Sequence, residues 1–425
     1  MNRVPTGLDT TMIELGLPKR LPDDTPAVQD RLRTVPGSAE AANDAVVQPD
    51  LLPDLHIGIG TTMIEPAFTG GHLDGIGVYT QALLRHLPHA GCAMQPYSWP
   101  RLRSAGPVTK GAALPHSFER ASFVDLLTPN AHRVHMPVDV FHVTDYRVIR
   151  MDCPVVASLH DALPVKHPEW CNPRMRGLKN WLQRKAAQKA DHVIALSHFA
   201  IDELVECFGI DERRITVVPC GVDDEWLNPP PAHAVATTLQ ANGLRPGYFL
   251  FVGTLQPRKN VERLLDAYLS LPPAVRAERQ LVIVGSAGAR SEELLRRIAA
   301  AVQDGADVVW LNRLTDNTEL RHVYAGAGVF VFASLYEGFG IPVVEAFASG
   351  VPVVASNTTS LPEVTAGAAL EVDPLDTGAI ADAMLTLARE SAVRARCITA
   401  GRARAAQLTW NATARQTAAV YRSLL

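Results

Sequence analysis

The chain has 425 residues, more than one ordinary hydrophobic core holds, which predicts two domains with appendages. With 47% hydrophobic and 20% charged residues and a net charge of −4, it reads as a globular protein, and the lack of a basic excess argues against nucleic acid as a main partner. Six scattered cysteines, no secretory signal and no apolar run approaching about 20 residues indicate a cytoplasmic protein with reduced thiols.

The first 53 residues differ from the rest of the chain. Residues 1–53 are rich in proline and show little sustained periodicity. We therefore expect an N-terminal extension that is partly disordered or draped over the surface, and we assign it no function.

From residue 55 onward, short apolar runs alternate with amphipathic stretches. This alternation is typical of parallel sheets covered by helices on both sides. The strands expected first are 55–60, 138–144, 154–160, 192–197 and 215–219. The proline-rich segment 228–247 is interpreted as a linker or hinge. After it, strands are expected at 248–253, 280–285, 307–312, 328–334 and 351–356.

Two helix starts stand out in the second series. Asn260 is expected to cap a helix whose buried stripe includes Val261 and Leu264, and Asp316 with Glu319 forms a pair like a capping box. The fold class that follows is α/β, with two Rossmann-like, doubly wound domains facing each other across a cleft. Ligands of such sheets bind at the carboxyl ends of the strands.

We predict four parts of the chain. After the extension at 1–53, the first domain covers 54–235 and the second covers 236–407. The last part, 408–425, is expected to be a C-terminal helix that packs back toward the first domain.

The stretch "SLYEGFGIPVVEAFASG" (334–350) carries the clearest chemistry. A strand is expected to end near Ser334, and a helix to begin with Pro342 in its first turn. Gly338 and Gly340 allow close approach of a ligand to the backbone, and free N–H groups at the helix start form an anion site that suits a diphosphate.

Two glutamates, Glu337 and Glu345, flank this turn. Paired carboxylates suggest acid/base chemistry of the kind used to cut sugars. Alternatively, they clamp a ligand, with Glu345 accepting hydrogen bonds from ribose hydroxyls and Glu337 facing the other end of the ligand. A purely structural interpretation, in which Glu345 favours the helix start and Glu337 is a solvated loop residue, has about even weight from the spacing alone.

In full, "EGFGIPVVEA" resembles the E-x7-E motif of glycosyltransferase family 4, retaining enzymes with the GT-B fold. Further stretches resemble family segments in the same order: "DGIGVYTQALLRHL" (74–87), "SLHDALPVKHPEW" (158–170), "ALSHFAIDELVECFGIDERRITVVPCGVD" (195–223) and "FVGTLQPRKN" (251–260). The His-Asp stretch resembles a subgroup rich in mannosyl- and other hexosyltransferases. Five ordered matches carry more weight than a lone glycine motif.

The resemblance implies roles for single residues. The first domain would be the acceptor side and the second would bind the nucleotide-sugar. Residues implied to bind the donor are Gly75, Gly77, Gly253, Arg258, Lys259, Gly338, Phe339, Gly340 and Glu345, and those implied to be catalytic are His160, Arg258, Lys259 and Glu337. Many relatives have arginine directly after the strand-ending glycine, where this chain has Thr254, so the diphosphate charge falls mainly on Arg258 and Lys259.

Weaker interpretations accompany these roles. Arg258 and Lys259 could simply form a basic turn at a helix start, and His160 could be a structural histidine. His142 and Asp145 are weaker acceptor-side candidates.

The activity implied is transfer of a hexosyl group from a nucleotide-sugar to a saccharide or lipid-linked saccharide in cell-surface polysaccharide synthesis, with retention at the anomeric carbon. GDP-mannose is the favoured donor; UDP-hexoses and dTDP-rhamnose stay open. No cofactor is expected, and no D-x-D metal motif stands out. The alternatives are an epimerase or sugar phosphorylase of the same fold, or an inactive binding subunit. A dehydrogenase is disfavoured because "GIGTTM" lacks the third glycine of a dinucleotide fingerprint.

The segment 170–190 is rich in lysine and arginine and contains Trp170 and Trp181. A solvated helix face is the favoured interpretation. The alternative is peripheral contact with an anionic membrane that carries a lipid-linked acceptor, at the inner face of the membrane.

Overall fold

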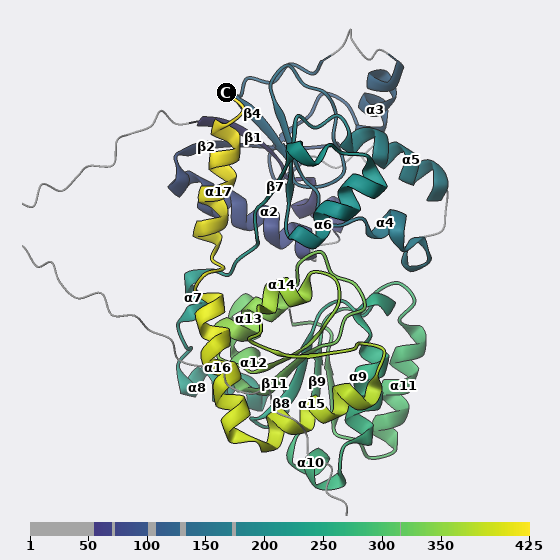
Figure 1. Cartoon of the computed structure of the whole chain (residues 1–425), viewed down its shortest axis with the longest axis vertical. Helices are drawn as coiled ribbons and strands as arrows, with labels where there is room; N and C mark the ends of the chain where they lie inside the picture. Colours follow the sequence, from purple (N-terminus) through teal and green to yellow (C-terminus); the bar gives the residue numbers. More distant parts are fainter. Residues whose placement is uncertain (1–54, 70–72, 101–107, 128–132, 172–175, 315) are drawn as a thin grey trace, which may run out of the picture. The chain divides into compact units, whose positions relative to one another are not determined.

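Two parallel β-sheets follow one another along the chain (Figure 1), as the alternating pattern predicts. The computed structural model describes residues 55–69, 73–100, 108–127, 133–171, 176–314 and 316–425. The predicted extension at 1–53 lies outside them. Both sheets belong to one compact unit, Leu51–Leu425.

The first sheet has the strand order β3-β2-β1-β4-β5-β6-β7, and all its pairs are parallel. Its strands are β1 (Leu55–Gly60), β2 (Cys92–Ser98), β3 (Ala112–Ala113), β4 (Val140–Val143), β5 (Val155–Ser158), β6 (His192–Ala195) and β7 (Ile215–Val217). The order reverses between β1 and β4, which is where a doubly wound sheet binds its ligand. We call this sheet and the helices up to residue 217 the first half.

Helices and single helical turns connect these strands. They are η1 (Thr62–Ile64), α1 (Pro66–Thr69), α2 (Gly75–His86), η2 (Leu87–Ala90), α3 (Phe118–Leu127), α4 (Leu163–Lys166), η3 (Pro168–Trp170), α5 (Arg176–Ala187), α6 (His198–Glu203), η4 (Leu204–Phe208) and η5 (Glu212–Arg214). The buried residues of α2 include Tyr79, Thr80 and Leu83, which share one face of the helix.

The second sheet has the order β10-β9-β8-β11-β12-β13, and it is also fully parallel. Its strands are β8 (Tyr248–Val252), β9 (Leu281–Val284), β10 (Val308–Leu311), β11 (Ala327–Phe332), β12 (Val353–Ser356) and β13 (Leu370–Val372). Here the order reverses between β8 and β11. Side chains of β8, β9, β11 and β12 are almost wholly buried, because helices cover both faces of a parallel sheet.

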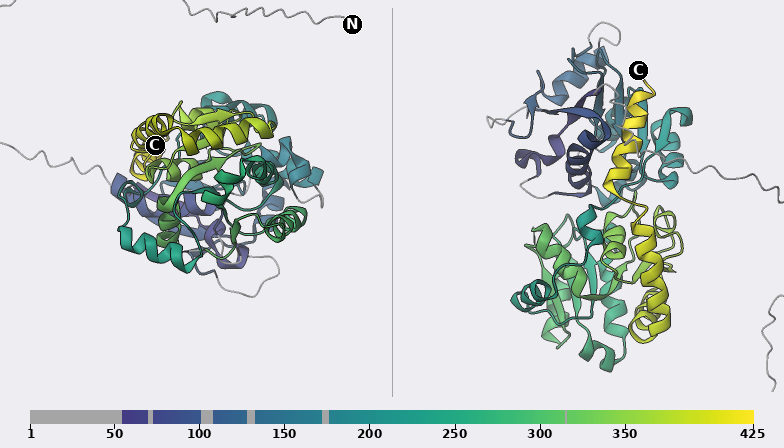
Figure 2. Two further views of the ribbon diagram at one scale, coloured as in Figure 1. Left: turned by 90° about the horizontal axis from the view of Figure 1, so that it is seen from below. Right: turned by 90° about the vertical axis from the view of Figure 1, so that its left-hand side faces the viewer.

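The second half comprises this sheet and its helices. They are α7 (Asp224–Leu227), α8 (Ala232–Ala241), η6 (Pro257–Lys259), α9 (Val261–Ser270), α10 (Pro273–Glu278), α11 (Glu292–Gln303), α12 (Asn317–Gly326), α13 (Ile341–Ala348), α14 (Leu361–Thr365), α15 (Thr377–Arg389) and α16 (Ser391–Ala405). The last helix, α17 (Trp410–Arg422), leaves this half. It packs against α2 and η2 of the first half, and both views of Figure 2 draw it at the end of the yellow segment.

Three expectations change at the level of secondary structure. The predicted linker 228–247 is wrong over ten residues, because α8 forms there and packs against α12. Asn260 does precede α9, but in a left-handed conformation and without capping it. Its side chain instead donates to the carbonyl oxygens of Ala333 (2.8 Å) and Pro374 (2.7 Å), which ties the end of β11 to the loop after β13. Strands β2, β3 and β13 were not predicted.

The chain passes between the halves twice, and the two passages are hydrogen-bonded to each other. The N–H of Val222 donates to the Leu408 carbonyl (3.0 Å), and the N–H of Trp410 donates to the Val222 carbonyl (3.1 Å). Gly221 permits this approach, since a Cβ there would lie 2.2 Å from the carbonyl carbon of Thr409. None of the described helices is long and apolar enough to cross a membrane.

Candidate functional site

The loops that follow β8 and β11, the two strands at the reversal of the second sheet, bring three predicted site residues together. Lys259 ends η6 and donates from Nζ to Oε1 of Glu337 (2.6 Å). Arg258 donates from Nη1 to Oε2 of the same carboxylate (2.9 Å) and to the Tyr336 carbonyl (3.1 Å). The three side chains are largely buried, and Lys259 also lies over the Phe332 ring at 4.9 Å from its centroid. We call this cluster the Glu337 triad.

Burial and mutual attraction set the charges of the triad. Burial raises the pKa of Glu337, but Lys259 and Arg258 outweigh that effect and leave it below its usual value. Burial lowers the pKa of Lys259 to about 8, against the opposing pull of Glu337. Although burial also lowers the pKa of Arg258, the Glu337 carboxylate raises it above its usual value. Near pH 7 the triad therefore holds two cations and one anion, and its net positive charge suits an anionic ligand.

The triad's loop touches the first half directly. A Cβ on Gly338 would lie 2.1 Å from the His160 carbonyl oxygen, so only glycine allows this approach. Ser197 donates from its hydroxyl to the Gly338 carbonyl (2.9 Å), and the N–H of Ala162 donates to the Tyr336 hydroxyl (3.2 Å). The loop after β11, which the resemblance assigns to donor binding and which we call the donor loop, thus meets the segment of the first half that contains His160.

His160 follows β5 and presents a neutral ring. Burial lowers its pKa, while Asp161 raises it to a smaller extent. The Nε2 atom lies 3.1 Å from the Thr144 carbonyl oxygen, which can only accept, so Nε2 carries the proton. The Nδ1 atom is then left as an acceptor for a hydroxyl. The Tyr79 ring packs edge-on against the imidazole, with 5.0 Å between ring centroids.

A buried chain of hydrogen bonds lies behind His160. The Tyr421 hydroxyl of α17 is 2.6 Å from Nδ1 of His142, whose Nε2 is 2.8 Å from the Ser158 hydroxyl. That hydroxyl is 2.8 Å from the Tyr79 hydroxyl. Burial lowers the pKa of His142 to about 3, so this ring is neutral. His142, expected as an acceptor-side candidate, is fully buried in a polar chain that supports the wall of the site.

The remaining predicted glycines lie at strand ends or helix starts. Gly253 directly follows β8, Gly75 begins α2, and the N–H of Gly77 donates to the Asp74 carboxylate (2.9 Å). Gly340 precedes α13 with a φ of 105°, and Pro342 lies in the first turn of that helix, as predicted. The Phe339 ring is buried in the hydrophobic core, which anchors the loop and leaves its backbone as the part able to meet a ligand.

Glu345 lies in α13, away from the hydrogen bonds of the triad. Its Oε2 accepts a hydrogen bond from the Tyr324 hydroxyl of α12 (2.9 Å). The residue is half-buried, and burial raises the pKa of its carboxyl to about 7. The carboxyl therefore changes charge near neutral pH, unlike that of Glu337.

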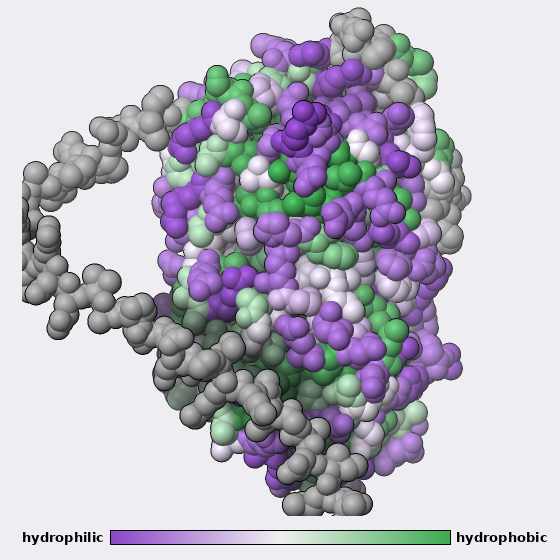
Figure 3. Space-filling model, in the orientation of Figure 1, coloured by the Kyte–Doolittle hydropathy of each residue, from purple (hydrophilic) through white to green (hydrophobic). Residues whose placement is uncertain are grey.

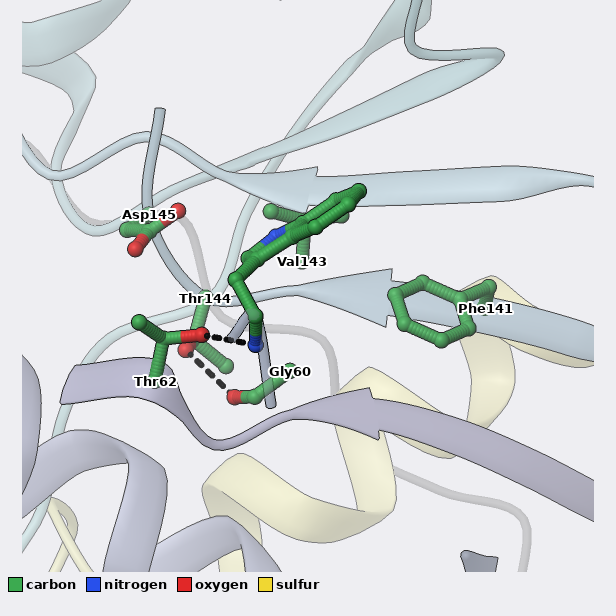
Figure 4. A pocket seen from close by; sticks show the side chains of 7 residues that line it. Gly60, Thr62, Phe141, Val143, Thr144 and Asp145 are labelled. Carbon is green, nitrogen blue, oxygen red and sulfur yellow. Dashed lines mark hydrogen bonds between the residues drawn. The ribbon is translucent and has the colours of Figure 1, made fainter. Parts of the chain in front are cut away.

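A small hollow lies at the strand ends of the first sheet (Figure 4). It is shallow and open at its mouth, and Gly60, Thr62, Thr144 and Asp145 line it together with Trp99, Phe141 and Val143. The Thr144 hydroxyl donates to the Gly60 carbonyl (3.1 Å) across β1 and β4. The Asp145 carboxylate, the other acceptor-side candidate, is paired with Arg147 at the rim.

Several residues that brace the site were not predicted. The Ser360 hydroxyl lies within hydrogen-bond distance of the carbonyl oxygens of Glu337 (2.9 Å) and Phe339 (3.1 Å). The Glu363 carboxylate accepts from the N–H groups of His198 (2.8 Å) and Phe199 (3.4 Å), capping α6 of the first half from the second half. "SLPEV" (360–364) has the composition of a helix start, but nothing in it indicates these partners. Among the described residues, no group of three His, Cys, Asp or Glu side chains could hold a metal ion.

Comparison with known proteins identifies the family. Residues 73–226 match the model described as "Glycosyltransferase Family 4", and residues 240–404 match "Glycosyl transferases group 1". O-antigen chain mannosyltransferase B of Escherichia coli is 32% identical over 275 residues, covering 63% of this chain and 70% of that protein. The chain belongs to glycosyltransferase family 4. It is a glycosyltransferase, as the E-x7-E motif predicts.

Other relatives and solved structures agree with this assignment. Alpha-maltose-1-phosphate synthase of Mycolicibacterium smegmatis is 30% identical over 298 residues, covering 64% of this family 4 chain and 73% of that protein. Sucrose-phosphate synthase from Thermosynechococcus elongatus has a TM-score of 0.68 at 22% identity, covering 87% of this chain and 99% of the other. Anabaena HepE, solved with UDP-glucose, has a TM-score of 0.67 at 17% identity, covering 87% and 100%. At these identities the structures show the fold alone, and the predicted GT-B fold is confirmed.

Proposed function

We propose that this enzyme transfers a hexosyl group, with mannosyl from GDP-mannose as the favoured case, from a nucleotide-sugar to a saccharide or lipid-linked saccharide. The observation that carries the proposal is the contact between Gly338 of the donor loop and His160. It brings the residue after Glu337 against the backbone of His160. In the proposed complex a sugar diphosphate spans the two loops, with its anionic end at the triad and its sugar at the histidine.

The diphosphate is the leaving group, and the chain supplies its charge stabilisation. When the bond between the anomeric carbon and the β-phosphate oxygen breaks, both bonding electrons stay with the phosphate. We assign Arg258 and Lys259 to that developing charge, and the start of α13 adds the positive end of a helix dipole. We propose that these groups act without a divalent metal ion.

Retention follows from front-face attack in this proposal. Glu337 is held by two cations, and Glu345 is bonded to Tyr324, so neither carboxylate is free to act as a nucleophile. The acceptor hydroxyl therefore attacks the anomeric carbon from the face that the diphosphate leaves, and its proton passes to the departing phosphate oxygen. His160 accepts a hydrogen bond from a donor-sugar hydroxyl at Nδ1, and closure of the halves excludes water.

The nucleoside is assigned to α13. Glu345 lies one turn beyond the start of α13, to which we assign the phosphates, and there it accepts hydrogen bonds from the ribose hydroxyls. The relatives support a hexose donor in different ways: one is named a mannosyltransferase, and a structural neighbour was solved with UDP-glucose. Mannose with a guanine nucleotide stays the favoured assignment, and uridine and deoxythymidine donors are its competitors.

The acceptor is assigned to the first half. The hollow at the strand ends of that sheet, lined in part by Asp145, is the place to which we assign the approaching acceptor hydroxyl. Since one relative is named for an O-antigen chain, we propose a growing cell-surface polysaccharide as the acceptor. A lipid-linked form of it would bring the enzyme to a membrane surface through residues 170–190.

Thermal shift with a panel of nucleotide-sugars tests the donor site, because a ligand that binds only the folded protein raises its apparent stability. GDP-mannose is expected to raise the melting temperature more than UDP-glucose or dTDP-rhamnose, and Glu345→Ala is expected to remove the shift. Glu390→Ala, outside the site, is the matched control. If no nucleotide-sugar shifts the melting temperature, the donor assignment is wrong.

Product analysis separates transfer from the alternative activities. Incubation with GDP-mannose and an oligomannoside acceptor is expected to give an extended saccharide with an α-linkage, read from the one-bond coupling between the anomeric carbon and its proton. An epimerised nucleotide-sugar, or a sugar phosphate formed only with added inorganic phosphate, would identify an epimerase or a phosphorylase. Donor binding without turnover for any acceptor would identify a binding subunit.

A further inference from the structure

Large hydrophobic side chains are exposed together on two helices of the first half. Within the described residues, ten such side chains are exposed, and five of them lie on α3 and α5. They are Phe123 (62% exposed), Leu127 (64%), Leu178 (50%), Trp181 (44%) and Leu182 (39%). Single exposed leucines are ordinary on a protein surface, whereas a cluster this dense indicates a contact.

Helix α5 turns its apolar stripe away from the protein. Leu178, Trp181 and Leu182 are spaced at i, i+3 and i+4, so they share one face of the helix. The opposite face packs inward through Ala187 and through Asn180, whose side chain donates to the Pro164 carbonyl (2.7 Å). An ordinary amphipathic helix buries its apolar stripe, and α5 exposes it.

Basic side chains flank this stripe. Helix α5 contains four basic and no acidic residues, and Lys179, Arg184 and Lys185 are exposed. The aliphatic stems of lysine and arginine allow their charged ends to reach outward past bound apolar groups. Lys179 and Arg184 lie to the sides of the stripe, and Lys185, at i+7 from Leu178, continues it toward the end of the helix. The exposed face of α5 is therefore apolar in the middle and cationic at its sides and at its C-terminal end.

Helix α3 borders α5 and extends the apolar area. The Asp125 carboxylate of α3 is paired with Lys189, two residues beyond the end of α5, and accepts from Arg150 (3.0 Å). This acidic group is thereby turned inward, while Phe123 and Leu127 remain outside. Figure 1 draws the two helices next to each other, and Figure 3 shows hydrophobic patches among hydrophilic residues on this half.

We propose that α3 and α5 form one docking surface for a membrane that contains anionic lipids, with Trp181 and its apolar neighbours among the headgroups and the lysines and arginine beside the phosphates. A second copy of the chain fits the surface less well, because a symmetric contact would bring the cations of α5 face to face. The proposal rests on the proposed function only in that a lipid-linked acceptor would be presented there; binding to lipid requires no nucleotide-sugar.

Vesicle co-sedimentation of the full chain tests this surface. Binding to phosphatidylcholine vesicles is expected only when they contain phosphatidylglycerol. The triple change Lys179→Glu, Arg184→Glu, Lys185→Glu is expected to weaken the partition by about a hundredfold or more, because each lost cation costs about 1 kcal/mol at such a surface. The control Arg313→Glu, Arg396→Glu, Arg415→Glu changes the net charge equally at exposed positions elsewhere, and is expected to weaken it much less.

The apolar side chains of the docking surface are tested separately. Leu178→Ser, Trp181→Ser, Leu182→Ser is expected to abolish sedimentation with vesicles, whereas Val302→Ser, Leu375→Ser, at positions 46% and 61% exposed in the second half, is expected to retain it. Equal binding by the two serine variants would refute the proposal, as would a wild-type protein that ignores anionic vesicles.

Two further readouts distinguish the alternatives. If the wild-type chain is a dimer in sedimentation velocity without lipid and the α5 serine variant is a monomer, the surface binds a second copy and the proposal fails. Thermal shift with GDP-mannose is expected to be the same for the α5 serine variant and the wild type. Vesicle binding without any nucleotide-sugar effect would leave the docking surface standing while the proposed donor fails.

Discussion

The two walls of the candidate site differ in charge. The wall from the second half is ionic, since Lys259, Arg258 and Glu337 meet in one buried cluster. In the wall from the first half, burial holds the rings of His160 and His142 uncharged, and the charged groups that act on His160 are carboxylates, chiefly that of Asp161. The contrast indicates that the cations for the leaving group come from the second half, while the first half offers a neutral ring to the sugar.

The largest effect on activity is expected from a variant that removes a charge from the ionic wall. Lys259→Ala is expected to lower kcat/KM by about 10²–10³-fold, the typical loss when one preorganised group that stabilises developing charge is removed. Initial rates with a saturating acceptor measure it. Arg263→Ala, a neighbouring cation on α9 outside the triad, is the control and should retain activity. If both variants lost activity alike, the triad would have no special role.

The contact between the walls is the next target. Gly338→Ala would place a Cβ 2.1 Å from the His160 carbonyl oxygen, so the halves must move apart. We expect a loss of about tenfold or more in kcat/KM, because small misplacement of reacting groups is costly. Gly177→Ala is the matched control, since a Cβ there meets nothing within 4 Å. Unchanged activity in Gly338→Ala would mean that this contact is not needed for turnover.

The pH dependence of donor binding separates the two ends of the proposed donor site, Glu345 at the ribose and Lys259 at the diphosphate. Burial raises the pKa of Glu345 to about 7, and burial lowers that of Lys259 to about 8. Below pH 7 Glu345 gains a proton and loses acceptor capacity for ribose, and above pH 8 Lys259 loses its charge toward the diphosphate. Affinity for GDP-mannose is expected to peak between these values and to fall by up to about tenfold per pH unit on either side.

Calorimetric titrations across pH 5.5–9.5 check this profile. Glu345→Gln should flatten only the acidic limb, since it removes the group that gains a proton there. Lys259→Arg should flatten only the alkaline limb. A profile in which Glu345→Gln altered the alkaline limb instead would contradict the assignment of the two ends of the donor.

The smallest effect is expected from His142 of the first half, and it concerns stability. Because the pKa of folded His142 is about 3, below that of an unfolded histidine, the unfolded state binds more protons in mild acid and stability falls as pH drops below about 6.5. This one group is expected to lower the free energy of unfolding by about 1.4 kcal/mol between pH 7.5 and 5.5. Urea unfolding of the wild type and His142→Gln at both pH values measures it; an equal pH dependence in the two proteins would show that His142 is not held neutral.

Much of the fold could be predicted from local patterns. All ten predicted strands form, because buried parallel strands read as short, uninterrupted apolar runs. Strand β2 escaped prediction because Gln95 and Pro96 break such a run. Helix α8 was missed because the prolines at 229–231 suggested a linker, although the alanine-rich residues after them favour a helix.

The site was predictable only in part, for a physical reason. The motifs located Arg258, Lys259 and Glu337, but their roles remain predictions, and their ion pairs join residues 78 and 79 positions apart through the neighbouring strands β8 and β11. Tyr421 supports the first half from 279 positions beyond His142. No local pattern contains such partners, since they exist only once both sheets have formed. The predicted domain boundaries also remain predictions.

The two hydrogen-bonded passages between the halves constrain how the enzyme can open. Because Val222 and Trp410 are joined where the chain goes out and where it returns, the halves cannot simply slide apart. Any opening must instead pivot at this double tether, so a small rotation there becomes a larger displacement at the Gly338–His160 contact. Admission of the donor and release of the nucleoside diphosphate then require the same rotation about one edge, where two backbone hydrogen bonds and the close approach at Gly221 hold the passages together.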